Sequence, residues 1–223
     1  MHYPDAGRGS IRVVIVEDHP VTLEGIRTIL TEADDIKVAG AAQDGAEAEA
    51  LVRDRNPDVL LLDLRLPDRR PLEVARWVRR HHPATTTLIL TAHDRDVLLS
   101  RAIESDVSGY LTKDQDVHHL VGAIRRAAAG ESLLTGQQLR RAHRWQVEVG
   151  TRLESLTDRE REVLSLLGQG MDNAAIAAAL EISVNTVRAH CRHIYNKLGV
   201  HKRAEAMAFA QDIDTSDPGR SPR

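Results

Sequence analysis

Short apolar runs and longer amphipathic stretches alternate along the first half of the chain. The run Val13 to Val16 has no polar residue, which is typical of a strand buried on both faces of a sheet. The stretch that follows carries apolar residues at the three- and four-residue spacing of one helix face. Apolar runs lie at 11–16, 36–42, 58–62, 87–91 and 107–111, and helical patterns at 20–31, 44–54, 71–81, 95–104 and 115–129. Strands that alternate with helices predict an α/β domain: a five-stranded, doubly wound parallel sheet covered on both faces.

The pattern changes after residue 129. Residues 130–152 are polar, with room for a short helix, and we interpret them as a linker. Residues 153–212 contain only helical patterns, separated by turn and capping signals. The sequence therefore predicts two domains, an α/β domain over 10–129 and a small all-α domain over 153–212. A polar, charged tail at 213–223 is expected to be disordered.

Capping signals mark the helices of the second domain. Thr157 precedes Glu160 by three residues, the spacing of a capping box. Asp172 and Ser183 precede two further helical patterns as N-caps, and Gly199 is placed to end the second of these helices. The helix that starts at Ser183 has its apolar stripe at Val187, Cys191, Ile194 and Leu198.

Composition narrows the class of protein. The chain has 223 residues, a formal net charge of -3 and a hydrophobic fraction of 42%, as expected of a globular protein. Its single cysteine, Cys191, excludes an internal disulfide and offers no zinc-binding spacing, which fits a reducing compartment. No segment approaches the roughly 20 apolar residues of a membrane span. We therefore expect a cytoplasmic protein that has no contact with the membrane.

Carboxylates follow two of the predicted strands directly. Glu17 and Asp18 end the first strand, and Asp63 ends the third. If these strands are neighbours, the acids meet at the carboxyl edge of the sheet, where α/β proteins bind ligands. Clustered carboxylates with no lysine partner among them favour a hard divalent cation, and Mg²⁺ prefers such oxygen ligands. Thr91 and Lys113 end the fourth and fifth runs at the same edge, which suits a phosphoryl group on Asp63.

Four motifs in this order, VEDHP, LLLDLRLP, LILTA and GYLTKD, resemble the receiver domain of response regulators, which has a flavodoxin-like fold. The segment LTDREREVLSLLGQGMDNAAIAAALEISVNTVRAHCRHIYNKLGV is similar to the LuxR-type helix-turn-helix. Together they resemble two-component response regulators of the NarL/FixJ type, over about residues 11–210. The resemblance implies that Asp63 is the phosphoacceptor and that Asp18 is a direct Mg²⁺ ligand. Glu17 would act largely through water, and the backbone carbonyl of Arg65 would be a further ligand.

The resemblance also implies residues that respond to phosphorylation. Lys113 would pair with a phosphoryl oxygen, Thr91 would hydrogen-bond the phosphoryl group, and Tyr110 would reorient as a reporter of that step. The sequence departs from the family pattern in both domains: Pro71 stands where the family usually has glycine, and Ala174 and Ala175 stand where its second helix usually has a Lys-Glu pair. Proline is tolerated in the first turn of a helix, because its missing N–H would have no partner there.

Charge is segregated along the chain. Residues 11–128 hold 20 acidic and 16 basic residues, whereas residues 183–203 hold five basic residues and no acid. A local basic patch attracts the phosphate backbone of double-stranded DNA. Arg188 and Arg192 share one helix face and are the candidates for reading bases. By resemblance Ala189 also faces the major groove, and the candidates for phosphate contacts are Asn185, Thr186, His190 and Lys197.

These features lead to one hypothesis. A histidine kinase phosphorylates Asp63, and the modified protein forms a homodimer and binds specific DNA sites to regulate transcription. The apolar side of the last helix, at Ala204, Ala206, Met207 and Phe209, is a candidate dimer contact. RNA polymerase is a further candidate partner, and the protein itself is not expected to be an enzyme.

Two alternatives stay open at the level of sequence. In one, the protein binds DNA but its receiver works without phosphorylation, as a dimerisation or ligand-binding module. In the other, the protein is a Mg²⁺-dependent phosphotransferase or phosphatase acting on small molecules. Enzymes of the haloacid-dehalogenase type need a second acid two residues after the nucleophile, and that position is Arg65. The sequence thus disfavours the enzymatic alternative.

Overall fold

The structure is a computed structural model that describes residues 9–67, 71–92, 94–114 and 117–214. The chain divides into two compact units, residues 1–142 and 143–223. The predicted disordered tail lies outside the described residues, apart from the two residues that end the last helix. Among the described helices, none has both the length and the apolar character needed to cross a lipid bilayer.

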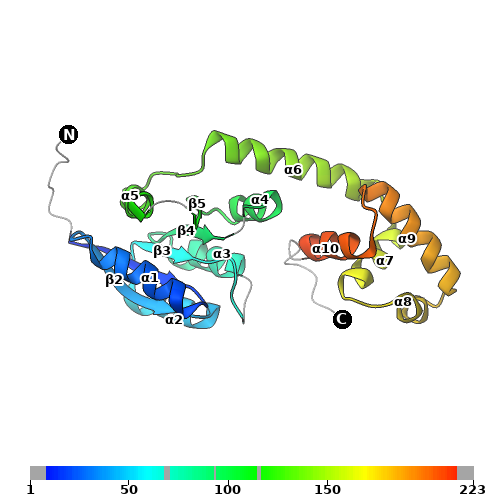
Figure 1. Cartoon of the computed structure of the whole chain (residues 1–223), viewed down its shortest axis with the longest axis horizontal. Helices are drawn as coiled ribbons and strands as arrows, with labels where there is room; N and C mark the ends of the chain where they lie inside the picture. Colours follow the sequence, from blue (N-terminus) through cyan, green and yellow to red (C-terminus); the bar gives the residue numbers. More distant parts are fainter. Residues whose placement is uncertain (1–8, 68–70, 93, 115–116, 215–223) are drawn as a thin grey trace. The chain divides into compact units, whose positions relative to one another are not determined.

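The first unit is a parallel sheet with helices in the connections between strands (Figure 1). All four strand pairs are parallel, in the order β2-β1-β3-β4-β5, which confirms that the first and third strands are neighbours. The strands are β1 Ile11–Val16, β2 Ile36–Ala42, β3 Val59–Leu62, β4 Thr86–Thr91 and β5 Gly109–Thr112. The helices are α1 Pro20–Thr31, α2 Gly45–Arg55, α3 Pro71–His81, α4 Asp96–Glu104 and α5 Val117–Ala128. Pro71 is the first residue of α3, where a proline is tolerated.

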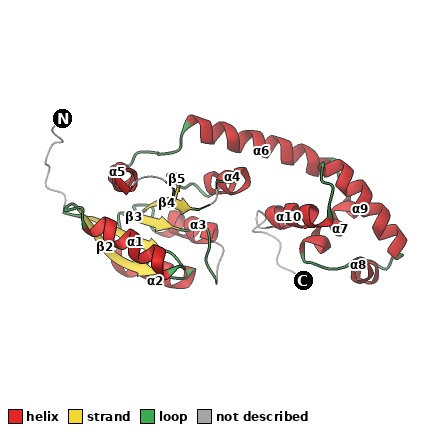
Figure 2. Cartoon of the chain, in the orientation of Figure 1, coloured by secondary structure: helices red, strands yellow, loops and turns green. Residues whose placement is uncertain are grey.

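Strand β1 lies inside the sheet, between β2 and β3, which explains why its residues 13–16 are all apolar. Val14 and Val16 pack in a core with α2, α3 and α4, whereas Val13 and Ile15 pack in a second core with α1 and α5. Side chains alternate between the two faces of a strand, so a strand covered on both sides needs an uninterrupted apolar run. The sheet and the helices that cover it can be followed in Figure 2.

The predicted linker differs from expectation, because most of it is one long helix. Residues Gly136–Glu154 form α6, with 19 residues, where the sequence suggested at most a short helix. Thr135 and Gln138 start this helix as a capping box: the Gln138 amide donates to the Thr135 hydroxyl at 3.1 Å, and the Thr135 amide donates to Gln138 Oε1 at 2.9 Å. The remaining residues of α6 are mostly strong helix formers such as Gln, Arg, Leu and Ala.

The second unit packs four short helices around one core. They are α7 Asp158–Gly168, α8 Asn173–Ala179, α9 Val184–Leu198 and α10 Arg203–Asp214. All predicted caps are present: Thr157 and Glu160 form a capping box, and Asp172 and Ser183 accept hydrogen bonds from backbone amides of their helices. Gly199 ends α9 with a φ of 66°, a backbone conformation that favours glycine. The predicted apolar stripe of α9, including Cys191, is buried in this core.

The expectation for the last helix is wrong in part. Ala206 was expected to belong to a dimer contact, but it is fully buried within the second unit. Helix α10 packs closely on α7, where Gly168 leaves room for Ala210: a Cβ on the glycine would lie 2.9 Å from the Ala210 Cβ. Phe209 also packs against the core of this unit. Much of the apolar side of α10 therefore stabilises its own domain.

Replacing Thr157 with alanine should destabilise the second unit by about 1 kcal/mol, because the amide of Glu160 loses its capping hydroxyl. Hydrogen exchange of the α7 amides in the full chain measures this loss. Thr151→Ala is the matched control, since that exposed hydroxyl bonds only a carbonyl inside α6. Equal exchange in α7 for both variants would contradict the structural role of the cap.

Candidate functional site

The carboxyl edge of the sheet brings Glu17 and Asp63 together. The Asp63 amide donates to the carbonyl of Val16 at 3.0 Å, so the end of β3 lies beside the end of β1. Both side chains are almost completely buried, with exposed fractions of 1% for Glu17 and 5% for Asp63. Two adjacent buried carboxylates repel each other, and each loses hydration. The site therefore needs a positive charge.

Lys113 supplies that charge in this structure. Its ammonium group lies 2.6 Å from Glu17 Oε2 and 2.7 Å from Asp63 Oδ2. The expectation of an acidic cluster without a lysine partner is therefore wrong. Burial alone would lower the pKa of Lys113, but the hydrogen bonds to Asp63 and Glu17 outweigh burial and raise it. Burial raises the pKa of Glu17, and the hydrogen bond from Lys113 offsets this only in part.

Asp18 contacts His19 and has no described contact with Lys113. One of its carboxylate oxygens lies 2.7 Å from His19 Nδ1, and its side chain is 27% exposed. Glu17, Asp18 and His19 each offer one ligand atom, and these atoms lie within 4.8 Å of one another. Sequence reasoning missed His19, although it directly follows the two acids in the motif VEDHP.

The donor atoms at this edge fit a hard divalent cation such as Mg²⁺. The carboxylates of Glu17 and Asp18 offer oxygen ligands close together, whereas Asp63 is not part of this close group and contacts Lys113 instead. Arg65 is exposed, and no described contact tests the predicted role of its carbonyl oxygen. The metal ligands therefore stay a prediction.

Two of the predicted switch residues, Thr91 and Lys113, lie at the same edge of the sheet, whereas Tyr110 lies inside β5, two residues before its end. The Lys113 amide donates to the carbonyl of Thr91 at 2.8 Å, which joins the ends of β4 and β5. Thr91 is buried, with an exposed fraction of 3%. Tyr110 is also buried, and burial together with the charge of Asp94 raises the pKa of its hydroxyl to about 12. The phenol therefore stays neutral at any physiological pH.

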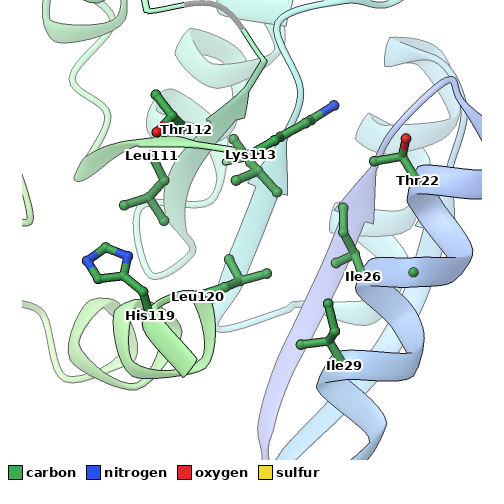
Figure 3. A pocket seen from close by; sticks show the side chains of 10 residues that line it. Thr22, Ile26, Ile29, Leu111, Thr112, Lys113, His119 and Leu120 are labelled. Atoms are coloured by element: carbon green, nitrogen blue, oxygen red, sulfur yellow. The ribbon is translucent and has the colours of Figure 1, made fainter. Parts of the chain in front are cut away.

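An apolar cavity of about 260 Å³ lies between α1 and α5, beside the end of β5, which Lys113 directly follows. Figure 3 shows Ile26 and Ile29 of α1 opposite Leu111 and Leu120. Its lining includes Lys113 but none of the predicted carboxylate ligands. The cavity is therefore separate from the cluster of acids.

The second unit presents a basic surface along α9. Arg188 and Arg192 are exposed, and the buried stripe of Val187, Cys191 and Ile194 lies on the opposite side of the helix. Asn185 and Thr186 are exposed in the first turn, and Ala189 and His190 are half-buried. Both arginines also line an open hollow between α8 and α9, together with Asn173 and Tyr195, which sequence reasoning had not singled out.

Lys197 has an internal partner. Its ammonium group lies 2.7 Å from Glu160 Oε2, and Glu160 is only 4% exposed. Burial alone would raise the pKa of Glu160, but hydrogen bonds from Lys197 and the Thr157 amide outweigh it and lower the pKa. The predicted phosphate contact of Lys197 would therefore compete with an ion pair that joins α9 to α7.

Glu17→Gln should stabilise the metal-free first unit at pH 7. The fold disfavours the charged form of Glu17, because its pKa is raised above 4.5, and glutamine carries no charge. As the pH falls through the raised pKa, wild-type Glu17 becomes protonated and the advantage of glutamine shrinks. Below pH 4.5 the carboxyl is protonated in both folded and unfolded chains, so the advantage disappears.

Urea unfolding across a pH series tests this, followed by Trp77 fluorescence in a background with Trp145→Phe. The matched control is Glu32→Gln at the exposed end of α1, which should change the free energy of unfolding by less than about 0.5 kcal/mol. A Glu17→Gln variant that is less stable than wild type at pH 7 would contradict this account of the site.

Known proteins match both units. Residues 13–125 match the response regulator receiver domain, and residues 154–210 match the luxR family of bacterial regulatory proteins. The chain is 35% identical to the probable transcriptional regulatory protein NarL of Mycobacterium tuberculosis, over 90% of this chain and 93% of that protein.

Solved structures agree with these matches. The response regulator ChrA, of a heme-sensing two-component system, is 33% identical with a TM-score of 0.56, over 93% of this chain and 99% of that one. RcsB in complex with DNA supports the fold alone, at 23% identity and a TM-score of 0.65, over 92% of this chain and 100% of that one. The chain therefore belongs to the two-component response regulators that join a receiver domain to a LuxR-type DNA-binding domain.

Proposed function

We propose that a histidine kinase phosphorylates Asp63, and that this modification controls dimerisation and sequence-specific DNA binding. The observation that carries the proposal is the buried pair of Glu17 and Asp63, bridged by the Lys113 ammonium group. A regulator that only binds DNA has no need for two buried carboxylates at the ligand-binding edge of a sheet, because their burial lowers stability. We further propose that the protein acts in the cytoplasm, where its kinase partner and DNA are available.

The reaction follows from the nucleophile and its neighbours. A carboxylate oxygen of Asp63 attacks the phosphorus atom of the donor, the bond from phosphorus to the donor imidazole breaks, and an acyl phosphate forms. Bound Mg²⁺ would supply positive charge for the phosphoryl oxygens, held by Asp18, Asp63 and the Arg65 carbonyl, with Glu17 acting through water. Lys113 already lies 2.7 Å from the Asp63 carboxylate, so its ammonium can follow the new negative charge.

Phosphorylation changes the charge at Asp63 from about -1 to about -2. The Thr91 hydroxyl, at the end of the neighbouring strand, would donate to the phosphoryl group, and Tyr110 would respond to its displacement. Such a change shifts the receiver between two conformations rather than creating a new fold. The second unit then binds DNA through α9, with Arg188, Arg192 and Ala189 toward the bases and Asn185, Thr186 and His190 toward the phosphates.

The chain should gain the mass of one phosphoryl group when incubated with Mg²⁺ and acetyl phosphate. Asp63→Asn should abolish this gain, because the amide is not a competent nucleophile. The control is Asp54→Asn, which changes an exposed acid on α2 and should leave the gain intact. Intact-protein mass spectrometry measures all three proteins, and a gain that persists in Asp63→Asn would overturn the assignment of the acceptor.

Arg188→Ala and Arg192→Ala should each weaken binding to a DNA site selected from a random pool by about 1–3 kcal/mol and relax its sequence preference. The loss should be smaller on unrelated DNA, because base contacts are absent there. Arg152→Ala, an exposed arginine of α6, is the control and should bind as wild type does. Uniform losses on selected and unrelated DNA would show that these arginines contact only phosphates.

A further inference from the structure

The first half of α6 is tied to the receiver through one arginine. Arg141 donates from two guanidinium nitrogens to the two carboxylate oxygens of Asp94, at 2.8 and 2.9 Å. Its Nε donates to Asp96 Oδ1 at 2.8 Å. The Arg141 side chain is only 25% exposed, so water screens this pair less than a fully exposed one. A two-pronged arginine–carboxylate contact also fixes geometry, which a lysine could not do.

A second contact lies one helical turn earlier. Gln138 Nε2 donates to the carbonyl of Tyr110 at 2.9 Å. Ala142 lies on the same face of α6 and is buried in the core that also contains Tyr110 and Leu99. All these residues belong to the first compact unit. The helix therefore begins as an integral part of the receiver, attached at β5 and at the start of α4.

Both contacts lead back to the predicted switch residues. Asp94 follows Thr91 by three residues, and Thr91 ends β4 beside Lys113. Asp94 also lies close enough to Tyr110 for its charge to raise the pKa of the phenol. The Asp94 carboxylate accepts hydrogen bonds from Arg141, and the backbone carbonyl of Tyr110 accepts one from Gln138. A displacement of Thr91 reaches α6 through a single short segment of chain.

We propose that Arg141 and Gln138 form a clasp through which α6 senses the state of Asp63; this inference rests on the proposed phosphorylation. In this structure the clasp is closed. When Thr91 moves to donate to the phosphoryl group, it draws Asp94 away from Arg141, and the start of α6 is released. Helix α6 runs from residue 136 to residue 154, across the boundary between the two units, so a change at its start is passed toward the DNA-binding unit.

Linkage gives the clasp a second consequence. If phosphorylation opens the clasp, then opening the clasp by substitution must favour the phosphorylated form by the same factor. Arg141→Gln should therefore bind beryllofluoride, a mimic of the phosphoryl group, at least about five-fold more tightly than wild type in the presence of Mg²⁺. A contact with a purely structural role would not have this effect, because its loss would destabilise the free and the beryllofluoride-bound protein equally.

Hydrogen exchange over residues 137–146 of the full chain tests the proposal, with and without Mg²⁺ and beryllofluoride. In wild type, beryllofluoride should speed exchange of these amides. In the Arg141→Gln variant, these amides should exchange fast even without beryllofluoride, and adding it should cause no further increase. Arg141→Lys keeps the charge, and its exchange should respond to beryllofluoride less than wild type but more than Arg141→Gln. This variant keeps the proposal testable if Arg141→Gln folds poorly. Arg140→Gln, an exposed neighbour on α6, is the matched control and should behave as wild type.

The outcomes separate the clasp from the proposed function. If beryllofluoride protects the amides near Asp63 and Thr91 but leaves residues 137–146 unchanged, the clasp is refuted and phosphorylation at Asp63 stands. Unchanged beryllofluoride affinity in Arg141→Gln also refutes the clasp. If beryllofluoride changes no amide in wild type, the proposed phosphorylation fails, and the clasp fails with it.

Discussion

The ammonium group of Lys113 between Glu17 and Asp63 is the interaction on which the receiver depends. The two carboxylates follow neighbouring strands and are almost completely buried, so a nearby positive charge is needed to offset their mutual repulsion. Lys113 reaches both because β5 ends at the same edge of the sheet. The three charged side chains therefore satisfy one another, and a phosphoryl group or a metal ion would have to rearrange these contacts.

Local sequence patterns were sufficient to predict most of the fold. The uninterrupted apolar run of β1 reports burial on both faces, and the capping residues Thr157, Asp172 and Ser183 mark the starts of three helices within one residue. The full length of α6 was not predicted, because its polar composition resembles that of a linker. The capping box at Thr135 and Gln138 was the local signal for its start. Its start is stabilised by contacts with residues about 30 to 45 positions away in the chain, which local periodicity does not contain.

For the site as well, the sequence predicts which residues lie near each other but not which side chains bond. Strand ends identified Glu17, Asp63, Thr91 and Lys113 as members of one edge, since parallel strands share a carboxyl edge. Spacing could not show that Lys113 bonds two carboxylates at once, because that depends on side-chain conformations reached only in the folded chain. The α10 expectation failed for a related reason: an apolar helix face has the same sequence pattern whether it packs on α7 or on a second molecule.

The ion pair between Lys197 and Glu160 has a consequence for how this DNA-binding domain can diverge. Position 197 lies on α9, the helix proposed to bind DNA, but its side chain also neutralises an acid enclosed between two helices. An exchange to a neutral residue would leave that acid enclosed without its counter-charge. Descendants of this protein can therefore change Arg188 or Arg192, the proposed base-reading positions, far more freely than Lys197, where a change would also reduce the amount of folded regulator in the cell.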